Sequence, residues 1–426
     1  MKRRELLRNL GLGSLMTALP GVWSNIANGA VASDRLWVVV TAPGGWDPVS
    51  FCNPRLSSQL YPGGKPMSHY TADMLDQAGN IKYVKLLAAG VPTSYGAFVE
   101  KYYRELLVIN GIETNNGNHS IGVKISSSGH SSPTMPSFAA YAAAASLNAD
   151  ALPLPYLAAG GYVNTAGLIS RVPLGGVENI PELLTANMQN GKAMLTNKAV
   201  TDLHNKRLKR VLDQKLASQL PREILEQQAF YGGQLSTQQF KRLSDKLPAA
   251  LSTSGTKRNI QHLCAAMAAG LTVSGQMEMR TGAPWDSHDD HDNRASVNIT
   301  NMFDNLDFLL TEADRHGLRN RLNVIVASDF GRTPFFNPDA GKDHWSVTSM
   351  LFIGPDFSGN RVIKLDDDNV KARAVDINTF LPKADGEIVT SRHVFRTLRS
   401  LTGSLGSPVD LEFDLGAPAL PKLFKV

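Results

Sequence analysis

Short apolar runs rich in β-branched residues recur along the chain, and amphipathic stretches separate them. Four runs have the length of a strand, and a fifth, weaker run alternates apolar and polar residues: Leu36–Val40, Leu106–Ile109, Val324–Val326, Met350–Ile353 and, alternating, Gln276–Arg280. Uninterrupted apolar runs of this length are typical of strands that are buried on both faces.

Helical patterns lie between these runs and after the last of them. Residues 258–273 and 392–401 repeat their apolar residues at helical spacing, and a further pattern runs from Ile299 until Gly317 stops it. Strands that alternate with amphipathic helices predict an α/β fold, in which helices flank a mostly parallel sheet.

Two segments differ from this alternation. From about residue 178 to 256 the sequence is polar, helical in pattern and rich in Lys, Arg, Gln and Asn, which predicts a helical insertion in a single α/β domain spanning residues 33–426. The first 32 residues contain paired arginines, a modestly apolar stretch and Ala30-Val31-Ala32 before Ser33. We interpret them as a twin-arginine signal peptide, whose removal leaves a periplasmic or secreted protein with no transmembrane segment.

The charge balance changes once this leader is set apart. The formal net charge is +5, but the first 32 residues hold four basic residues and one acidic residue, so the remainder carries only +2. An even mixture of charges gives no footprint for a polyanion, and we therefore expect no nucleic-acid partner. Cys52 and Cys264 could form one disulfide bridge or remain two buried thiols.

Acidic and histidine residues follow four of the predicted strands. The loops after these strands contain, in chain order, Asp47, His119 with Ser120, the run Asp286–Asp292, and Asp329 with Arg332 and His344. The run Asp286–Asp292 alone could equally be a solvated turn. Because the carboxyl ends of parallel strands share one edge of a sheet, all four loops are expected to meet there. Carboxylates and imidazoles without thiolates suit a divalent ion: zinc, manganese, magnesium or calcium.

Three of these segments together resemble a known family. Gly-Gly-Trp-Asp47, Trp-Asp286-Ser-His288 and Ser-Asp329-Phe-Gly-Arg332-Thr, with Asp-His344 further on, resemble the secreted domain-of-unknown-function family 1501. That family belongs to the alkaline phosphatase and sulfatase superfamily, so an alkaline phosphatase-like fold is implied from about residue 36 to the C-terminus.

The resemblance also implies roles for these residues. Arg332 would face a bound anion, and five side chains would be metal ligands: Asp47, Asp286, His288, Asp329 and His344. Phe330 stands where phosphatases of the superfamily have a histidine, so a second metal lacks a ligand unless His344, His119 or His130 replaces it.

The position of the nucleophile is the second departure from the superfamily. Counting back from Gly129, His119 occupies this position, and the neighbouring Ser120 could serve instead. No cysteine is present there, which excludes formylglycine chemistry. The sequence therefore predicts an exported metal-dependent hydrolase or transferase that acts on a phosphate or sulfate ester of a small molecule or polymer, with Ser120, His119 and Arg332 as catalytic candidates. The alternative is a non-catalytic secreted binding or assembly protein that retains the fold.

Overall fold

The computed structural model describes residues 34–86, 94–146, 152, 154–177, 188–189, 192–193, 237–280 and 283–425. The predicted signal peptide and most of the predicted insertion lie outside the described residues. Of the insertion, the structure describes two short strands, β9 (Met188–Gln189) and β10 (Lys192–Ala193), the helix α10 (Thr237–Lys246) and the residues that follow it.

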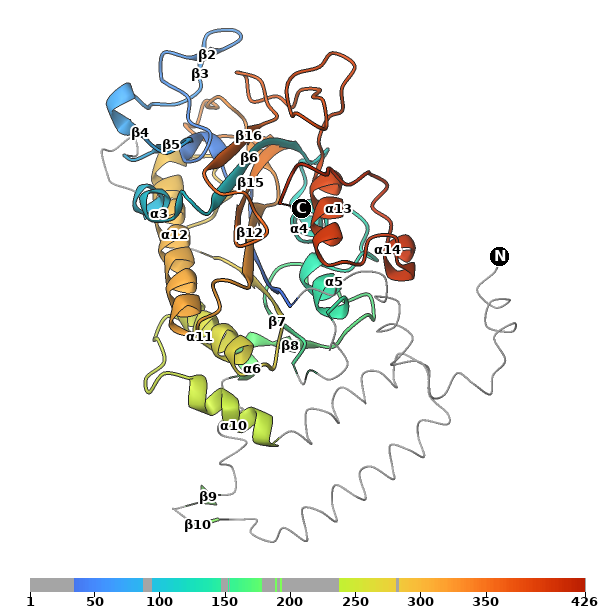
Figure 1. Cartoon of the computed structure of the whole chain (residues 1–426). Coiled ribbons are helices and arrows are strands. Elements are labelled where there is room, and N and C mark those ends of the chain that lie inside the picture. The colour runs from blue at the N-terminus through green and yellow to red at the C-terminus, as the bar shows by residue number, and fades with distance from the viewer. Residues whose placement is uncertain are drawn as a thin grey trace.

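An eight-stranded sheet forms the centre of the molecule (Figure 1). Its strands are, in spatial order, β16 (Arg361–Lys364), β6 (Leu106–Glu113), β15 (Val347–Ile353), β12 (Leu322–Ser328), β1 (Leu36–Ala42), β11 (Ser274–Glu278), β7 (Tyr156–Ala159) and β8 (Arg171–Pro173). Within this sheet β15 runs antiparallel to both of its neighbours, and the other neighbouring pairs are parallel. The prediction of a mostly parallel sheet is confirmed, and all five predicted strands are present.

Strand β1 shows why its sequence is apolar without interruption. Val38 and Val40 pack into the hydrophobic core on one face of the sheet, and Trp37 and Val39 pack into the core on the other face. Successive side chains of a strand point to opposite faces, so a strand covered on both sides buries every residue.

Helices cover both faces of the sheet (Figure 1). One layer contains α3 (Ser94–Tyr102), α11 (Gly255–Ala268) and α12 (His291–Arg315); the other contains α4 (His119–Ser128), α5 (Phe138–Ala144) and α13 (Ser391–Leu401). The helix predicted over residues 258–273 is α11, which ends earlier because Gly270 adopts a left-handed φ of 70° and turns the chain toward β11. Short helices α6 (Leu174–Val177) and α14 (Pro408–Glu412) complete the described helices.

Small elements lie at the carboxyl edge of β1 and β12. A 3-10 turn η2 (Pro48–Ser50) follows β1, and β13 (Gly331–Arg332) pairs with β14 (His344–Trp345) directly after β12. Two hairpins, β2 (Leu60–Tyr61) with β3 (Lys65–Pro66) and β4 (Leu75–Ala78) with β5 (Ile81–Val84), and the 3-10 turn η3 (Ala72–Met74) form the segment between β1 and α3. The pairing of β13 with β14 brings the residues after β12 next to His344.

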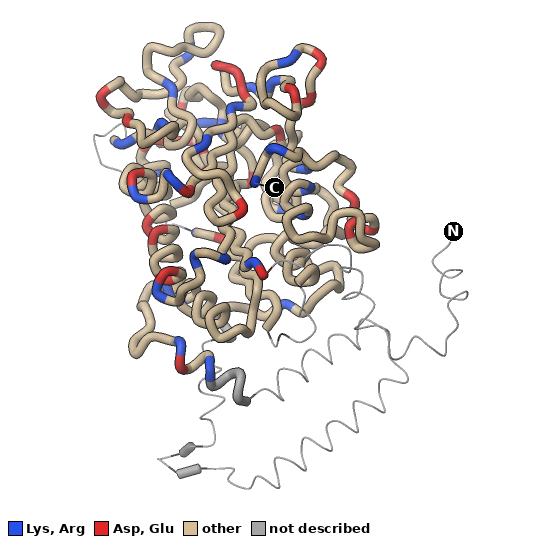
Figure 2. Tube along the Cα trace, viewed as in Figure 1, with Lys and Arg blue, Asp and Glu red and all other residues tan. Residues whose placement is uncertain are grey.

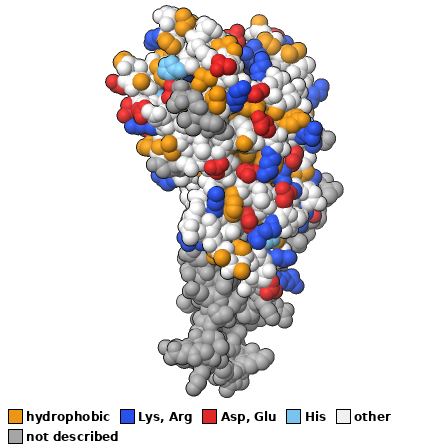
Figure 3. Space-filling model, turned by 90° about the vertical axis from the view of Figure 1, so that its left-hand side faces the viewer, with side chains coloured by type: hydrophobic (Ala, Val, Ile, Leu, Met, Phe, Trp, Pro, Cys, Tyr) orange, Lys and Arg blue, Asp and Glu red, His pale blue; other side chains and the backbone are white. Residues whose placement is uncertain are grey.

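The described surface carries mixed charge. Figure 2 shows basic and acidic residues interleaved along the chain, and the face in Figure 3 mixes hydrophobic, basic and acidic side chains without a large area of one kind. None of the helices that the structure describes is long and apolar enough to cross a membrane. Cys52 and Cys264 are both buried and free, so of the two open alternatives the structure has the free thiols.

Candidate metal centre

Three segments place four side chains at the carboxyl edge of the sheet. His119 is the first residue of α4, Asp286 and His288 lie in the loop between β11 and α12, and His344 begins β14. Helix α4 begins here because the side chain of Asn118 caps it, accepting a hydrogen bond from the backbone N–H of Ser120 at 3.0 Å. We call His119, Asp286, His288 and His344 the His/Asp cluster.

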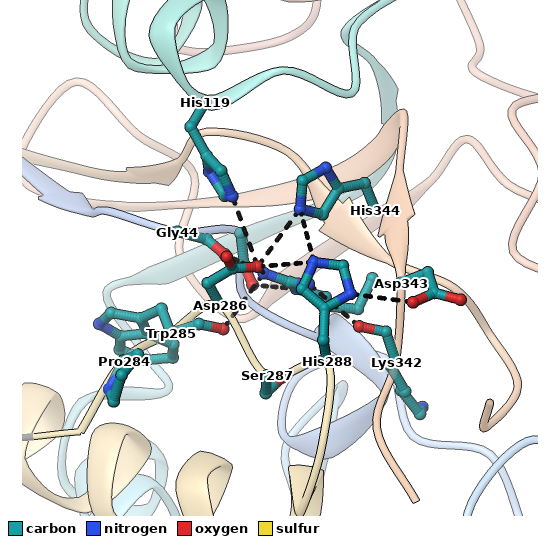
Figure 4. Close-up of polar contacts among 12 residues, drawn as sticks. Gly44, His119, Pro284, Trp285, Asp286, Ser287, His288, Lys342, Asp343 and His344 are labelled. Carbon is teal, nitrogen blue, oxygen red and sulfur yellow. Dashed lines mark hydrogen bonds and ion pairs between the residues drawn. The ribbon is translucent and has the colours of Figure 1, made fainter. Parts of the chain in front are cut away.

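The three imidazoles of this cluster surround one carboxylate oxygen (Figure 4). The Nε2 atoms of His288, His344 and His119 lie 3.1, 3.2 and 3.4 Å from Oδ1 of Asp286. The same oxygen accepts a hydrogen bond from Nη2 of Arg332 at 2.5 Å. Donor atoms of His119, Asp286 and His344 all lie within 4.8 Å of one another, which is a spacing that one metal ion can span.

The outer nitrogen of each imidazole has its own acceptor. Nδ1 of His119 contacts Oδ2 of Asp329 at 2.9 Å, and Nδ1 of His288 contacts Oδ1 of Asp343 at 2.9 Å. Nδ1 of His344 contacts the backbone oxygen of Gly117 at 2.6 Å. Because each partner is an acceptor, Nδ1 carries the proton in all three rings, and in a neutral ring Nε2 then presents a lone pair to the cluster. This arrangement is typical of histidines that bind a metal through Nε2.

The Nε2 atoms of the three imidazoles have too few hydrogen-bond donors around them. Nε2 of His288 lies 3.0 Å from Nε2 of His344, so two lone pairs face each other unless a cation or a proton lies between them. Nε2 of His119 is buried and has no hydrogen-bond partner among the described residues. Three imidazole nitrogens and one carboxylate suit a divalent ion such as zinc or manganese, so the residues present fit a metal.

The neighbouring charges also determine the pKa values of the cluster residues. Burial alone would raise the pKa of Asp286, but the hydrogen bond and charge of Arg332 outweigh it and lower this pKa to about 2. The hydrogen bond to Asp329 raises the pKa of His119, and the hydrogen bond from His288 lowers the pKa of Asp343. Asp286 is therefore fully ionised at neutral pH.

Of the five ligands predicted from the sequence, the structure brings Asp286, His288 and His344 together. Asp329 lies behind them: its Oδ2 accepts from His119 and from the backbone N–H of Gly44 at 2.9 Å, so it orients the imidazole of His119. Its Oδ1 is buried without a hydrogen-bond partner in the described structure. His119, predicted at the nucleophile position, instead points its Nε2 into the cluster.

Asp47 is the fifth predicted ligand, and the structure places it in a different group. Its Oδ2 accepts from Nζ of Lys342 at 2.7 Å, from Oγ of Ser50 at 2.9 Å and from Nε2 of His291 at 3.1 Å. Lys342 thus places a positive charge beside this carboxylate, and Asp47 lies outside the His/Asp cluster. Lys342 was not a sequence candidate, and His291 was included only as part of the run Asp286–Asp292.

Arg332 was predicted to face an anion, but its side chain is fully buried. Its Nε donates to the backbone oxygen of Gly45 at 2.9 Å, and Nη1 donates to that of Lys342 at 3.0 Å. Nη2 bonds to Asp286 and to the backbone oxygens of Gly44 and Trp285. The guanidinium therefore joins three loops and has no face directed to solvent.

The other sequence candidates lie outside the cluster. Ser120 is exposed, and its Oγ donates to Oδ1 of Asn118 at 2.7 Å as part of the helix cap. His130 follows the opposite end of α4, where its Nδ1 accepts from the backbone of Ser132 at 3.0 Å, so it does not supply the missing ligand.

Phe330 occupies the position where the resemblance led us to expect a histidine. Its ring is buried, and its centroid lies 4.7 Å from that of His119 and 4.5 Å from that of His344. Gly45, with a φ of 77°, lets the chain pass this ring, because a Cβ there would lie 2.6 Å from it. Phe330 thus forms an apolar wall that orients two imidazoles.

Comparison with solved structures gives distant similarities. The protein Ps i-CgsB aligns with a TM-score of 0.38 and 8% identity over 92% of this chain and 76% of its own. The same protein in complex with k-i-k-neocarrahexaose gives 0.35 and 7%, over 89% and 74%. A protein (BT33494S-sulf) from work on the metabolism of multiple glycosaminoglycans by Bacteroides thetaiotaomicron gives 0.37 and 11%, over 90% and 78%.

Comparison with protein families gives a match over most of the chain. Curated proteins gave no match. The family model described as "Protein of unknown function (DUF1501)" matches residues 37–376, from β1 through β16 and beyond the His/Asp cluster. The match includes every residue of that cluster and the chain around it. The chain therefore belongs to the DUF1501 family, as the motifs around Asp47, Asp286 and Asp329 indicated.

Proposed function

We propose that this protein is a metal-dependent hydrolase or transferase that acts on a phosphate or sulfate ester. The observation that carries the proposal is the convergence of three imidazoles: each Nδ1 faces an acceptor outside the cluster, and each Nε2 points at Oδ1 of Asp286. Three ring nitrogens that converge on one carboxylate form the donor set of a metal site. A divalent ion bound there would polarise an ester oxygen and generate a nucleophilic hydroxide at neutral pH.

The residues of the chain would contribute orientation and charge. Asp286, His119, His288 and His344 would hold the ion, and Asp329 would keep the proton of His119 on Nδ1. The positive end of the α4 dipole lies beside the cluster and favours an anionic ester over a neutral one. We also propose that the protein acts in the periplasm or outside the cell, on the basis of its paired N-terminal arginines.

Two observations favour the second candidate, a secreted binding protein that retains the metal without turnover. Ser120 bonds to Asn118 rather than to the cluster, and the guanidinium of Arg332 is used by backbone oxygens. Among the described residues, the hydroxyl and the arginine predicted to be catalytic are therefore not positioned for attack or for anion binding.

Metal reconstitution separates these candidates. The purified full-length chain would be chelated, reloaded with zinc, manganese, magnesium or calcium, analysed for bound metal, and assayed on aryl phosphate and aryl sulfate esters. We expect one ion per chain and metal-dependent turnover. The variant His344→Ala should abolish this turnover. The control His69→Ala, which removes an exposed histidine that pairs with Asp292, should retain it. Bound metal without turnover would establish the binding protein, and the absence of any bound metal would refute the proposal.

A further inference from the structure

We infer that Asp47 and Lys342 form an internal clamp that positions the two loops of the His/Asp cluster. The clamp consists of Asp47, Lys342, His291 and Ser287. This inference rests on the proposed function, because the groups that the clamp positions are the proposed metal ligands. It adds residues that position those ligands.

Four contacts close the clamp into a ring. Oδ2 of Asp47 contacts Nζ of Lys342 at 2.7 Å and Nε2 of His291 at 3.1 Å. Nδ1 of His291 contacts Oγ of Ser287 at 2.7 Å, and the backbone N–H of Lys342 donates to the backbone oxygen of Ser287 at 2.9 Å. The ring therefore joins the loop after β1, the loop after β11, the start of α12 and the loop before β14.

The ring touches the ligands through the backbone. Ser287 lies between Asp286 and His288 in the chain, and Lys342 lies two residues before His344. Gly341 lets these loops come into contact, because a Cβ there would collide with the backbone of His288. A displacement at Ser287 or Lys342 is thus passed directly to three of the four cluster side chains.

The members of the ring are withdrawn from water. The side chains of Asp47 and Lys342 are each 1% exposed and that of His291 is 2% exposed. Burial lowers the pKa of His291, so its ring is neutral, with Nε2–H donating to Asp47 and Nδ1 accepting from the hydroxyl of Ser287. Nζ of Lys342 donates to Asp47 and to the backbone oxygen of Met67 at 3.1 Å. Removing one ion of this buried pair would leave the other charge uncompensated and out of reach of solvent, so the pair favours the arrangement in which both are present.

The charge of Lys342 also affects the pKa of Asp47. Burial alone would raise the pKa of Asp47, yet the adjacent ammonium and His291 hold it well below its usual value. Every contact of the clamp is made between residues of the chain itself. We therefore expect the clamp to hold the ligand loops in a preorganised state.

The test uses full-length variants in which one or both charges are removed. Asp47→Asn and Lys342→Met each leave one buried charge, whereas the double variant leaves none. The matched control is Asp366→Asn, which breaks another buried pair: Asp366 contacts Nη2 of Arg55 at 3.2 Å, with the two side chains 0% and 5% exposed. Binding of Co²⁺ is measured by visible absorption, and amide hydrogen exchange is measured in the metal-free proteins over residues 284–290 and 337–344.

We expect each single variant to exchange faster in both loops and to bind Co²⁺ about 10- to 100-fold more weakly, as is typical when a group supporting a metal ligand is lost. The double variant should regain much of the wild-type melting temperature, because no uncompensated charge remains. Its Co²⁺ affinity should stay low, because the ring is open. The Asp366→Asn control should melt earlier yet bind Co²⁺ as the wild type does.

Two results would overturn the clamp. The first is a double variant with wild-type loop exchange and wild-type Co²⁺ affinity; the second is a control variant that loses Co²⁺ affinity as strongly as Asp47→Asn. If the single variants fail to fold, the double variant carries the comparison. A wild-type chain that binds no Co²⁺ would refute the proposed function instead, and the exchange of the two loops would still decide whether Asp47 and Lys342 position them.

Discussion

Replacement of Asp286 by asparagine tests the electrostatic balance of the His/Asp cluster in the metal-free protein. The change keeps the shape of the side chain but removes the negative charge that Arg332 and three imidazoles surround. Arg332 would keep its bonds to backbone oxygens but would lose its only ionised partner within the cluster. We therefore expect a loss of stability even when no metal is present.

The size of this loss follows from the geometry of the pair. The pKa of Asp286 falls from 3.8 to about 2, which corresponds to about 2 kcal/mol at about 1.4 kcal/mol per pH unit. The Asp286 side chain is 41% exposed, so solvent screening reduces this figure to about 1 kcal/mol. The fully buried partner, Arg332, keeps the value above that of an exposed ion pair.

The dependence on pH has a definite sign. A carboxyl whose folded pKa is lowered contributes its stability above the ordinary value of 3.8 and loses it as the pH falls through about 2. The gap in unfolding free energy between wild type and Asp286→Asn should therefore narrow as the pH falls from about 4 toward 2.

Denaturation with guanidinium chloride in the presence of chelator measures this gap directly. The wild type should exceed Asp286→Asn by about 1 kcal/mol at pH 7, with equal m-values. Equal stability of the two proteins at pH 7, or a gap that widens between pH 4 and pH 2.5, would show that Arg332 does not depend on this carboxylate and would refute the reasoning.

Three further outcomes are expected. In thermal unfolding, Zn²⁺ or Mn²⁺ at about 100 times its Kd should stabilise the wild type by about 2.7 kcal/mol. The control His69→Ala should gain the same stability, whereas His344→Ala should gain none. If His344→Ala gains as much as the wild type, His344 does not bind the ion. Arg332→Lys should lower the unfolding free energy by about 3 kcal/mol, because one ammonium cannot replace a planar guanidinium with four backbone acceptors and Asp286; a fall below about 1 kcal/mol in urea unfolding would contradict this. N-terminal sequencing of the exported protein should begin near Ser33, and lysine in place of both leader arginines should retain the precursor in the cytoplasm; export unaffected by that change would remove the twin-arginine interpretation.

The central sheet could be predicted from the sequence because a strand that is buried on both faces has an uninterrupted run of apolar residues. Every residue of β1 is buried, and the uninterrupted apolar run Leu36–Val40 follows from that. The direction of β15 could not be predicted in the same way. Its run Met350–Ile353 packs equally well in either orientation, and the antiparallel pairing with β12 and β6 depends on how the chain enters it through β14.

The residue types of the His/Asp cluster could be predicted from the sequence, but the grouping of the candidate residues could be predicted only in part. Asp286 and His288 stand in one short loop, so their proximity follows from the sequence alone. Asp47 and Lys342 lie far apart in the chain, and a lysine two residues before a histidine gives no sign that its ammonium will be buried. Arg332 has the residue type of an anion ligand, and only the fold shows that backbone oxygens use its donors.

The position of β1 in the sheet also determines when the sheet can form during synthesis of the chain. β1 is made early, yet Trp37 pairs with Ser274 on one side and Leu36 pairs with Leu322 on the other, so both neighbours emerge from the ribosome more than half a chain length later. Until then its apolar residues are exposed on a strand with two open edges, a state that favours aggregation and chaperone binding. His344 is translated later still, so the His/Asp cluster can assemble only after most of the chain has been synthesised.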